Sequence, residues 1–393
     1  MTRRRVVRGG NAFSTAAASL QLPSPPSALL DAAAASWRAR ATPETAAQLL
    51  RDGFVVLPNA FPPAFTAAIR REMHALHASQ QLYPNATHVL LSGADPAPTL
   101  LQKHHILETE LVLPEIRRQV PTLEWFFDSQ LVFGAMRDAM PSWLQLSAYM
   151  IKLQLNEGGG GCFPLHFDSY GDDGKCITAV LYLNDEWQPG DGGEIVLYPF
   201  PQRERVVVRP GDGDLVLFSS QQMLHRVLPS RRPRYCLTTW MYCDKSPRTP
   251  DAEQARQRYY DDATAAESVD ESSTTYRQQV LRKIVRSPTF RRHLAKLYHR
   301  AEWRQSLDES HVHDDAFQRF LATHDREVAL IEAATTQMLT KFRAKDPSGG
   351  SGGMTSSVPG TSDDLLALFA ALHNDDARAT DDAWLQRFPI EWF

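Results

Sequence analysis

The spacing of apolar residues predicts helices in the first part of the chain. Residues 63–77 carry apolar side chains three and four positions apart, the pattern of an amphipathic helix. A threonine, a proline and an acid at residues 42–44 begin a second helix, which Gly53 ends near residue 52. Residues 54–57 (Phe-Val-Val-Leu) follow as a short strand. The apolar positions of the longer helix are Phe65, Ile69, Met73 and Leu76.

Between residues 147 and 242 the period changes to two, which predicts strands. Turns rich in Gly, Asp and Pro separate these strands. Many short strands with closely spaced turns are typical of a jelly-roll sandwich or barrel. With the helices before it, this region predicts an α+β fold whose core is a jelly roll, or double-stranded β-helix. The expected strands are 148–155, 176–182, 194–198, 205–208, 214–218, 225–228 and 236–241.

After residue 245 the pattern becomes charged and helical. A Ser-Gly-Gly-Ser-Gly-Gly stretch predicts a flexible linker, and a short amphipathic helix near 363–373 precedes an aromatic tail that docks on the core or on a partner. The helical region is either a packing support or an arm for a protein partner. Its apolar stripe comprises Val280, Ile284, Phe290, Leu294 and Leu297. The expected segments are a flexible basic leader (1–40) with room for a short helix around 29–38, supporting helices and strand (41–146), the jelly roll (147–245), a helical extension (246–346), the linker (347–362) and the tail (363–393).

Charge and composition restrict the class of protein. The 393 residues carry a net charge of −4, which argues against a general nucleic-acid or membrane binder. No apolar run approaches the roughly 20 residues needed to span a bilayer, so we expect a soluble protein. Four cysteines without a short-spaced thiol pair predict a reducing, intracellular and cytoplasmic location. The arginine-rich, acid-free start of the chain fits a mitochondrial presequence and equally fits a disordered basic tail.

The candidate chemistry begins at the segment Pro-Leu-His-Phe-Asp, residues 164–168. On an extended strand, positions i and i+2 face one side, so His166 and Asp168 can converge on one ion. Two histidines and one carboxylate on one face of an octahedron leave open positions, an arrangement that suits Fe(II) oxygenases. The third ligand is expected from a later strand, and His225 follows 59 residues after His166.

A second His-x-Asp motif serves as an internal control. His313 and Asp315 are followed by His373 about 60 residues later, but they lie in polar helical sequence without strands to orient them. We therefore predict that this second set is solvated surface. The nearby stretch 311–313 (His-Val-His) is likewise expected to be polar surface.

The residues after His225 supply a candidate anion anchor. A turn of Pro, Ser and Arg leads to Arg234, which opens the next expected strand. Across an antiparallel hairpin Arg234 can point into the same cavity as His225 and grip a carboxylate in bidentate fashion. Arg231 and Arg232 are interpreted as turn charges, although either replaces Arg234 if the hairpin register shifts.

The block from about residue 152 to residue 242 resembles the Fe(II)/2-oxoglutarate dioxygenases of the prolyl 4-hydroxylase type, which include the oxygen-sensing prolyl hydroxylases. It does so through, in order, His-Phe-Asp (166–168), Cys-Ile-Thr-Ala-Val-Leu-Tyr-Leu-Asn (176–184) with Trp187, Gly-Gly-Glu (192–194), Asp-Leu-Val-Leu-Phe (214–218), His225 and Arg-Tyr-Cys-Leu-Thr-Thr-Trp (234–240). The resemblance implies that His166, Asp168 and His225 bind the iron and are the catalytic centre. It also implies that Arg234 pairs with the 5-carboxylate of 2-oxoglutarate, that Tyr182 donates to the same carboxylate, and that Thr238 and Trp240 line the cofactor cavity.

The resemblance further implies an enzyme that uses Fe(II), 2-oxoglutarate and O2, with ascorbate as reductant. Such an enzyme hydroxylates a substrate C–H bond and converts 2-oxoglutarate to succinate. A protein hydroxylase acting on an extended segment, with proline as the target, is the first hypothesis. An oxygenase of a small molecule or nucleobase is the alternative, although a basic groove with stacking aromatics is hinted at only by residues 231–234. A non-catalytic jelly-roll binding module is the third hypothesis, and retention of the full ligand set argues against it.

One departure from the family pattern leaves the prolyl assignment open. Many prolyl hydroxylases of this type carry a tyrosine shortly before the His-x-Asp motif, whereas residues 156–163 here read Asn-Glu-Gly-Gly-Gly-Gly-Cys-Phe. The four glycines predict either a mobile loop at the cavity mouth or a simple hairpin bulge.

Overall fold

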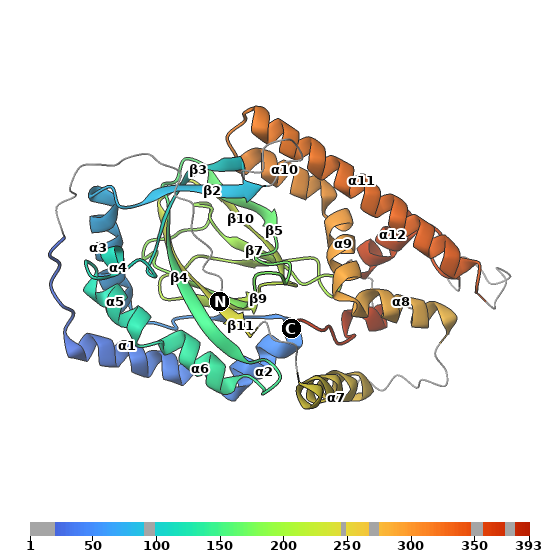
Figure 1. Ribbon diagram of the computed structural model, residues 1–393, viewed down its shortest axis with the longest axis horizontal. Coiled ribbons are helices and arrows are strands. Elements are labelled where there is room, and N and C mark those ends of the chain that lie inside the picture. Colours follow the sequence, from blue (N-terminus) through green and yellow to red (C-terminus); the bar gives the residue numbers. More distant parts are fainter. Residues whose placement is uncertain (1–19, 90–98, 245–248, 267–274, 347–356, 374–381) are drawn as a thin grey trace.

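Two antiparallel sheets form the centre of the molecule, with helices on both sides (Figure 1). The computed structural model describes residues 20–89, 99–244, 249–266, 275–346, 357–373 and 382–393. The expected α+β fold with a jelly-roll core is confirmed. No helix in these ranges is long and apolar enough to cross a bilayer.

The large sheet has the strand order β1-β9-β6-β11-β4-β3-β2, and the small sheet has the order β5-β10-β7-β8. All seven strands predicted from the period of two are present, with ends that differ by a few residues. The strands are β1 (Phe54–Leu57), β2 (Tyr83–Val89), β3 (Thr99–Glu110), β4 (Leu146–Asn156), β5 (Gly161–His166), β6 (Lys175–Tyr182), β7 (Ile195–Tyr198), β8 (Val206–Val208), β9 (Leu215–Ser219), β10 (Leu224–Ser230) and β11 (Arg234–Cys243).

Six helices cover the outer face of the large sheet (Figure 1). The Thr42 hydroxyl accepts a hydrogen bond from the Thr45 backbone N–H and caps the second of them, as predicted. The helix expected around residues 29–38 is present as the first of them, and it buries Trp37 completely. This part of the expected leader is therefore packed and not flexible, while residues 1–19 lie outside the described ranges. The helices are α1 (Ser27–Arg40), α2 (Pro43–Asp52), α3 (Pro63–Ala78), α4 (Pro114–Arg117), α5 (Pro121–Asp128) and α6 (Leu131–Ala139).

Of the predicted C-terminal helices, those within residues 276–372 pack on the side of the small sheet (Figure 1), whereas Tyr260 of the first one, residues 250–266, is buried in the core cluster of the N-terminal helices. Four members of the expected apolar stripe are buried, as predicted. The prediction is wrong for Phe290, whose side chain is 40% exposed. The predicted linker lies largely outside the described ranges, but Val358 near its end is buried in the core. The elements are α7 (Pro250–Ala266), α8 (Tyr276–Arg286), α9 (Pro288–Tyr298), α10 (Arg300–Ser310), α11 (Asp315–Arg343), α12 (Ser362–Leu372) and the short 3-10 helix η3 (Ala383–Gln386).

The aromatic tail docks back on the core, which decides between the two predicted destinations. Trp392 is fully buried, and its indole N–H donates to the Arg51 carbonyl at 3.2 Å. Its own carbonyl accepts a hydrogen bond from the Ser219 hydroxyl on β9 at 2.6 Å. Gly53 leaves room for the indole, since a Cβ at that position would lie 2.3 Å from the ring. The chain end is therefore part of the packing around α2 and β9.

A disulfide joins Cys176 at the start of β6 to Cys243 at the end of β11. The two residues are 67 positions apart, so only the register of neighbouring strands brings them together. This pairing does not support the reducing location predicted from cysteine count and spacing. Cys162 and Cys236 are free and buried.

Candidate active site

Strand pairing brings the two histidines of the predicted triad together. His166 is the last residue of β5, and it is the register partner of His225 on β10. Their ring centroids lie 4.2 Å apart. Asp168 follows just beyond β5, and the ligand atoms of the three side chains all lie within 4.8 Å of one another. No other such group of three is found among the described residues.

Backbone carbonyls fix the orientation of both imidazole rings. The His166 Nδ1–H donates to the Pro164 carbonyl at 2.7 Å, and the His225 Nδ1–H donates to the Met223 carbonyl at 3.1 Å. Each ring therefore presents a free Nε2 lone pair toward Asp168 Oδ1, at 3.5 Å and 3.9 Å. Hydrogen bonds of this kind set the tautomer of metal-binding histidines. Burial lowers the pKa of His225 to about 4, so this ring is neutral at pH 7.

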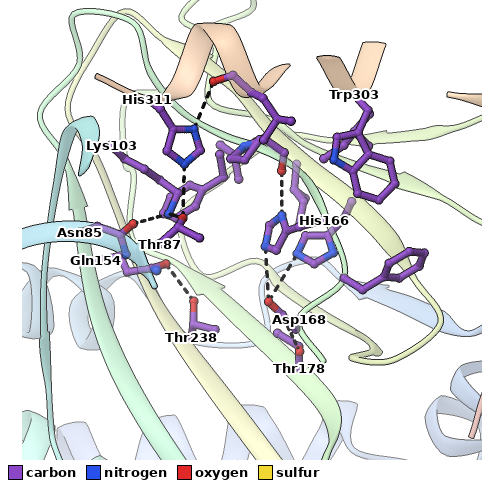
Figure 2. Close-up of a pocket in the computed structure, with 18 of the residues that line it drawn as sticks. Asn85, Thr87, Lys103, Gln154, His166, Asp168, Thr178, Thr238, Trp303 and His311 are labelled. Carbon is purple, nitrogen blue, oxygen red and sulfur yellow. Dashed lines mark hydrogen bonds and ion pairs between the residues drawn. The ribbon is translucent and has the colours of Figure 1, made fainter. Parts of the chain in front are cut away.

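Asp168 is held by two donors on one of its oxygens, and Figure 2 shows the first of them, Thr178. Its Oδ2 accepts from the Thr178 hydroxyl at 2.6 Å and from the Trp240 indole N–H at 3.1 Å. Burial alone would raise the pKa of Asp168, but the adjacent His225 and His166 hold it well below its usual range. The carboxylate thus stays ionised with Oδ1 facing the histidines. Two imidazoles and one carboxylate in this arrangement match the donor set of a non-haem Fe(II) site.

Arg234 is buried in the same cavity without an anionic partner. It opens β11, and one guanidinium N–H contacts the Cys236 sulfur at 3.4 Å. The guanidinium lies over the Tyr182 ring, with its carbon 5.0 Å from the centroid. No carboxylate among the described residues lies within 4.0 Å of it, and both Arg234 Nε and the Tyr182 hydroxyl lack hydrogen-bond partners.

A buried guanidinium without a counter-ion destabilises the fold, because nothing offsets the free energy of its desolvation. A bound ligand that supplies a negative charge removes this penalty. A carboxylate placed between Arg234 and Tyr182 would satisfy both unpartnered groups. Burial raises the pKa of Tyr182, so its hydroxyl remains protonated and able to donate. These two residues therefore fit the distal carboxylate of 2-oxoglutarate.

The remaining candidates occupy separate places. Thr238 lines the cavity, and its hydroxyl donates to Gln154 Oε1 at 3.0 Å. Trp240 contacts the triad itself through Asp168. Arg231 and Arg232 are exposed, so the shifted register that would have made either of them the anchor does not occur. The binding roles of all these residues remain predictions.

The cavity around the triad has a volume of about 440 Å³. The jelly roll supplies the triad and the Arg234 side, whereas two further walls were not predicted. One comes from β2 and β3, and the other comes from the C-terminal helices, as Figure 2 shows for several of these residues. The unpredicted lining residues include Asn85, Thr87, Lys103, Lys296, Trp303, His311, Phe320, His324 and Glu327.

Helix α10 is attached to both strands that carry the histidines. The Ser306 hydroxyl accepts a hydrogen bond from the Leu165 backbone N–H, next to His166. Arg226, next to His225, is buried and pairs with Glu302 at 3.3 Å and Glu309 at 2.7 Å. The helical extension is thus a fixed wall of the cavity. No motif in its sequence predicted that role.

His311 corrects one prediction of the sequence analysis. It is 1% exposed and lines the cavity, and its Nδ1 hydrogen-bonds the Leu307 carbonyl at 3.1 Å. It is therefore not polar surface, whereas His313 is exposed as expected. Asp314 in the control motif caps α11 by accepting from the Phe317 backbone N–H at 2.8 Å. His373 is not solvated surface either, since its Nε2 hydrogen-bonds the Pro201 carbonyl at 2.9 Å.

The glycine-rich segment forms the turn between β4 and β5. The Gly160 backbone N–H donates to the Ser230 carbonyl at 2.8 Å, and the Glu157 N–H donates to the His105 carbonyl at 2.9 Å. These bonds argue against a mobile loop. The hairpin interpretation is wrong as well, because β4 and β5 belong to different sheets and the segment is a turn between the two.

Comparison with known proteins agrees with this geometry. Residues 145–242 match the family model of the 2OG-Fe(II) oxygenase superfamily. The hypoxia-inducible factor prolyl hydroxylase of Caenorhabditis elegans is 31% identical over 136 residues, which are 34% of this chain and 18% of that protein. The human prolyl hydroxylase EGLN3 is 33% identical over 87 residues, 22% of this chain and 36% of that protein. The chain therefore matches only a minor part of the length of these curated relatives.

A solved structure extends the likeness beyond the jelly roll. A structure from a study of prolyl 4-hydroxylases of Phytophthora capsici is 28% identical, with a TM-score of 0.56, and the match covers 80% of this chain and 96% of that one. Together with the matched family model and the intact His-Asp-His geometry, this likeness places residues 145–242 as a domain of the 2OG-Fe(II) oxygenase superfamily, with prolyl hydroxylases among its relatives.

Proposed function

We propose that this chain is an Fe(II)- and 2-oxoglutarate-dependent dioxygenase that hydroxylates a C–H bond, with a prolyl residue of a protein segment as the target. In the balanced reaction, substrate, 2-oxoglutarate and O2 give hydroxylated substrate, succinate and CO2. His166, Asp168 and His225 would hold the iron. Bound Fe(II), with 2-oxoglutarate and O2, supplies the oxidising power for an unactivated C–H bond.

The observation that carries the proposal is the unpaired Arg234. A guanidinium 4% exposed, with no carboxylate within 4.0 Å among the described residues, faces the cavity that contains the triad. A site for a metal alone would not need this cation. Arg234 would orient the distal carboxylate by charge-assisted hydrogen bonds, and the Tyr182 hydroxyl would donate to the same group.

The other residues of the site preserve its geometry. Thr178 and Trp240 occupy Asp168 Oδ2, which leaves Oδ1 as the oxygen that would bind the metal. The apolar lining and the fixed wall of α10 restrict water around the reacting centre. The chain's part in catalysis is thus placement, exclusion of water and choice of substrate.

The prolyl target is supported by the kinds of relatives that match. The curated relatives are prolyl hydroxylases, and the Phytophthora structure, from a study of prolyl 4-hydroxylases, is matched over most of this chain. Ascorbate belongs to the same proposal as the reductant that sustains turnover, and its addition should raise the yield of succinate. A small molecule or nucleobase as substrate is the alternative outcome of a substrate screen.

The proposal is tested by anaerobic titration of the metal-free full chain with Fe(II) and then 2-oxoglutarate, monitored by visible charge-transfer absorption. The wild type is expected to develop a band, His166→Ala should lose it, and Arg234→Ala should require far more 2-oxoglutarate. Arg232→Ala is the matched control, because this exposed arginine neighbours the anchor in sequence but pairs with Asp191 at 3.4 Å. A wild type that binds iron but shows no band at any 2-oxoglutarate concentration would contradict the proposal.

A further inference from the structure

Lys103 lines the cavity but belongs neither to the triad nor to the Arg234 anchor. It lies in an irregular part of β3, where pairing with β2 shifts between Pro84↔Leu107 and Ala86↔Gln102. Its backbone forms a bridge with His311, and the Val312 N–H donates to the Gln102 carbonyl at 3.0 Å. The C-terminal extension thus helps to place this lysine.

The ammonium of Lys103 has uncharged partners. Its Nζ donates to Asn85 Oδ1 at 2.7 Å and to Thr87 Oγ1 at 2.7 Å. A lysine ammonium has three N–H bonds, and no carboxylate among the described residues lies within 4.0 Å of this one. Within the part of the chain that the structure describes, one N–H bond of the ammonium therefore has no acceptor and no carboxylate offsets its charge, so both are open to a group that enters the cavity.

The acid that acts electrostatically on Lys103, Glu108, already has other partners. Glu108 accepts from the Asn85 amide at 2.5 Å through Oε2, and it pairs with Lys152 at 2.8 Å through Oε1. Lys296, another cation of the cavity wall, pairs with Glu327 at 2.6 Å. Of the cations that line the cavity in the described residues, Lys103 and Arg234 are the two without a carboxylate partner. Arg234 is taken by the proposed cosubstrate.

The hydrogen bonds from Lys103 through Thr87 to His311 all run in one direction, with each group donating to the next until the histidine accepts (Figure 2). The Thr87 hydroxyl accepts from Lys103 and lies 3.3 Å from His311 Nε2, to which it can donate. His311 in turn donates from Nδ1 to the Leu307 carbonyl. Burial lowers the pKa of His311 to about 4, so it is a neutral acceptor and does not compete with the lysine for an anion.

Lys103 is separated from the triad by one aromatic ring. Its Nζ lies 5.4 Å from the centroid of Phe163, and that ring stacks with His166 at 6.5 Å between centroids. Lys103 and the triad also line the same cavity, so a substrate whose reacting carbon approaches the triad can extend past Phe163 to the lysine.

We propose that Lys103, held by Asn85 and Thr87, is a substrate-binding residue that selects a carboxylate close to the C–H bond to be hydroxylated. The proposal rests on the proposed function and names its substrate class as acidic. One ammonium with one free donor matches a single carboxylate, whereas a phosphate dianion would leave a buried charge unmatched. The carboxylate belongs to an Asp or Glu side chain, or to a chain end.

The test measures binding to the full chain loaded with Mn(II) and 2-oxoglutarate, which prevents turnover. The probes are short peptides with a central proline. The first set is capped at both ends and has Asp or Glu beside the proline, and the second set has Asn or Gln in place of the acid. The third set repeats the Asn or Gln peptides with the C-terminus uncapped, so that its carboxylate is free. Inorganic phosphate is a further probe. The variants are Lys103→Gln, Lys103→Arg and, as a matched control, Lys296→Gln, which removes a cation of the same cavity that already has a partner.

The wild type should bind at least one acidic probe about ten-fold more tightly than its amide form, a difference of about 1.4 kcal/mol. Lys103→Gln should abolish this preference, while Lys103→Arg and Lys296→Gln should retain it. The side-chain and chain-end arms identify which carboxylate is recognised. The proposal is overturned if no probe shows an acid preference, if phosphate binds in preference to every carboxylate, or if the preference survives in Lys103→Gln.

A second readout in the same samples separates the two proposals. Affinity for 2-oxoglutarate should be unchanged in Lys103→Gln, which also shows that the variant is folded. A loss of 2-oxoglutarate affinity comparable with that of Arg234→Ala would assign Lys103 to the cosubstrate and contradict the inference alone. A wild type that binds neither metal nor 2-oxoglutarate would instead contradict the proposed function.

Discussion

Gly193 lies directly against Arg234. A Cβ at position 193 would be 2.8 Å from Arg234 Cδ and 3.0 Å from the Ser230 hydroxyl. The backbone of Gly193 has a φ of +79°, which side-chain-bearing residues rarely adopt. The Gly-Gly-Glu element of the sequence thus makes room for the buried guanidinium.

We predict that Gly193→Ala weakens 2-oxoglutarate binding about ten-fold, because the added methyl group displaces Arg234. Iron affinity should change little, since the triad lies on other residues. Both are measured by anaerobic titration. Gly190→Ala is the control, because Gly190 also has a positive φ, +97°, but nothing lies within 4 Å of its added Cβ. Equal losses in both variants would mean that backbone strain, not displacement of Arg234, is the cause.

Trp240→Phe tests the support of Asp168. The substitution removes the indole donor to Oδ2 and keeps an aromatic ring, so Fe(II) affinity is expected to fall about 10- to 100-fold. Thr178→Val removes the other donor and should act in the same direction. Trp303→Phe alters an aromatic side chain of the cavity wall and should leave iron affinity unchanged. Unchanged iron affinity in both donor variants would contradict the role of these hydrogen bonds.

Trp392→Ala is predicted to destabilise the fold by about 3–5 kcal/mol, because a fully buried indole against Gly53 is replaced by a cavity. Denaturant unfolding measures the change. Trp392→Phe should lose less, since most of the ring remains. A midpoint of unfolding equal to that of the wild type would show that the tail contributes nothing to stability.

The proposed acid preference should depend on pH through Lys103. Burial lowers its pKa to about 8, with Glu108 and Cys162 acting to raise it and Lys152 acting to lower it further. The lysine is charged below this pKa, so the preference for acid over amide probes should be greatest there and decline as pH rises through about 8. A bound carboxylate raises the pKa and shifts the decline upward. A preference that stays constant well above pH 9, measured as the ratio of dissociation constants, would contradict this prediction.

The sequence was sufficient for the elements that depend on local pattern. The helix at 43–52 and the strand after it follow from Thr42 and Gly53, and the jelly-roll strands follow from alternation. The His-x-Asp motif was assigned correctly to the β-rich region because strands orient side chains, while its duplicate near His313 falls at the start of a helix.

The remaining features depend on contacts between distant residues. The strand β3 was not predicted. Its pairing is irregular around Lys103, and the polar side chains there interrupt the apolar–polar alternation by which a strand is recognised in a sequence. His311 belongs to the cavity because α10 packs against β5, which no periodicity in residues 300–310 reveals. The disulfide of Cys176 likewise requires the register of β6 and β11. Contacts of this kind cannot be predicted from local sequence, because they form only when the strands and helices have assembled.

The most direct test of the central claim compares 2-oxoglutarate with 2-oxopentanoate, which has the same carbon chain but no distal carboxylate. Affinities are measured anaerobically on the Fe(II)-loaded wild type and on Arg234→Met. We predict that the wild type prefers 2-oxoglutarate by roughly 100-fold or more, because only its carboxylate completes the buried guanidinium, and that Arg234→Met loses most of this preference. Equal affinities of the wild type for the two keto acids would contradict the assignment of Arg234 and, with it, the proposed cosubstrate.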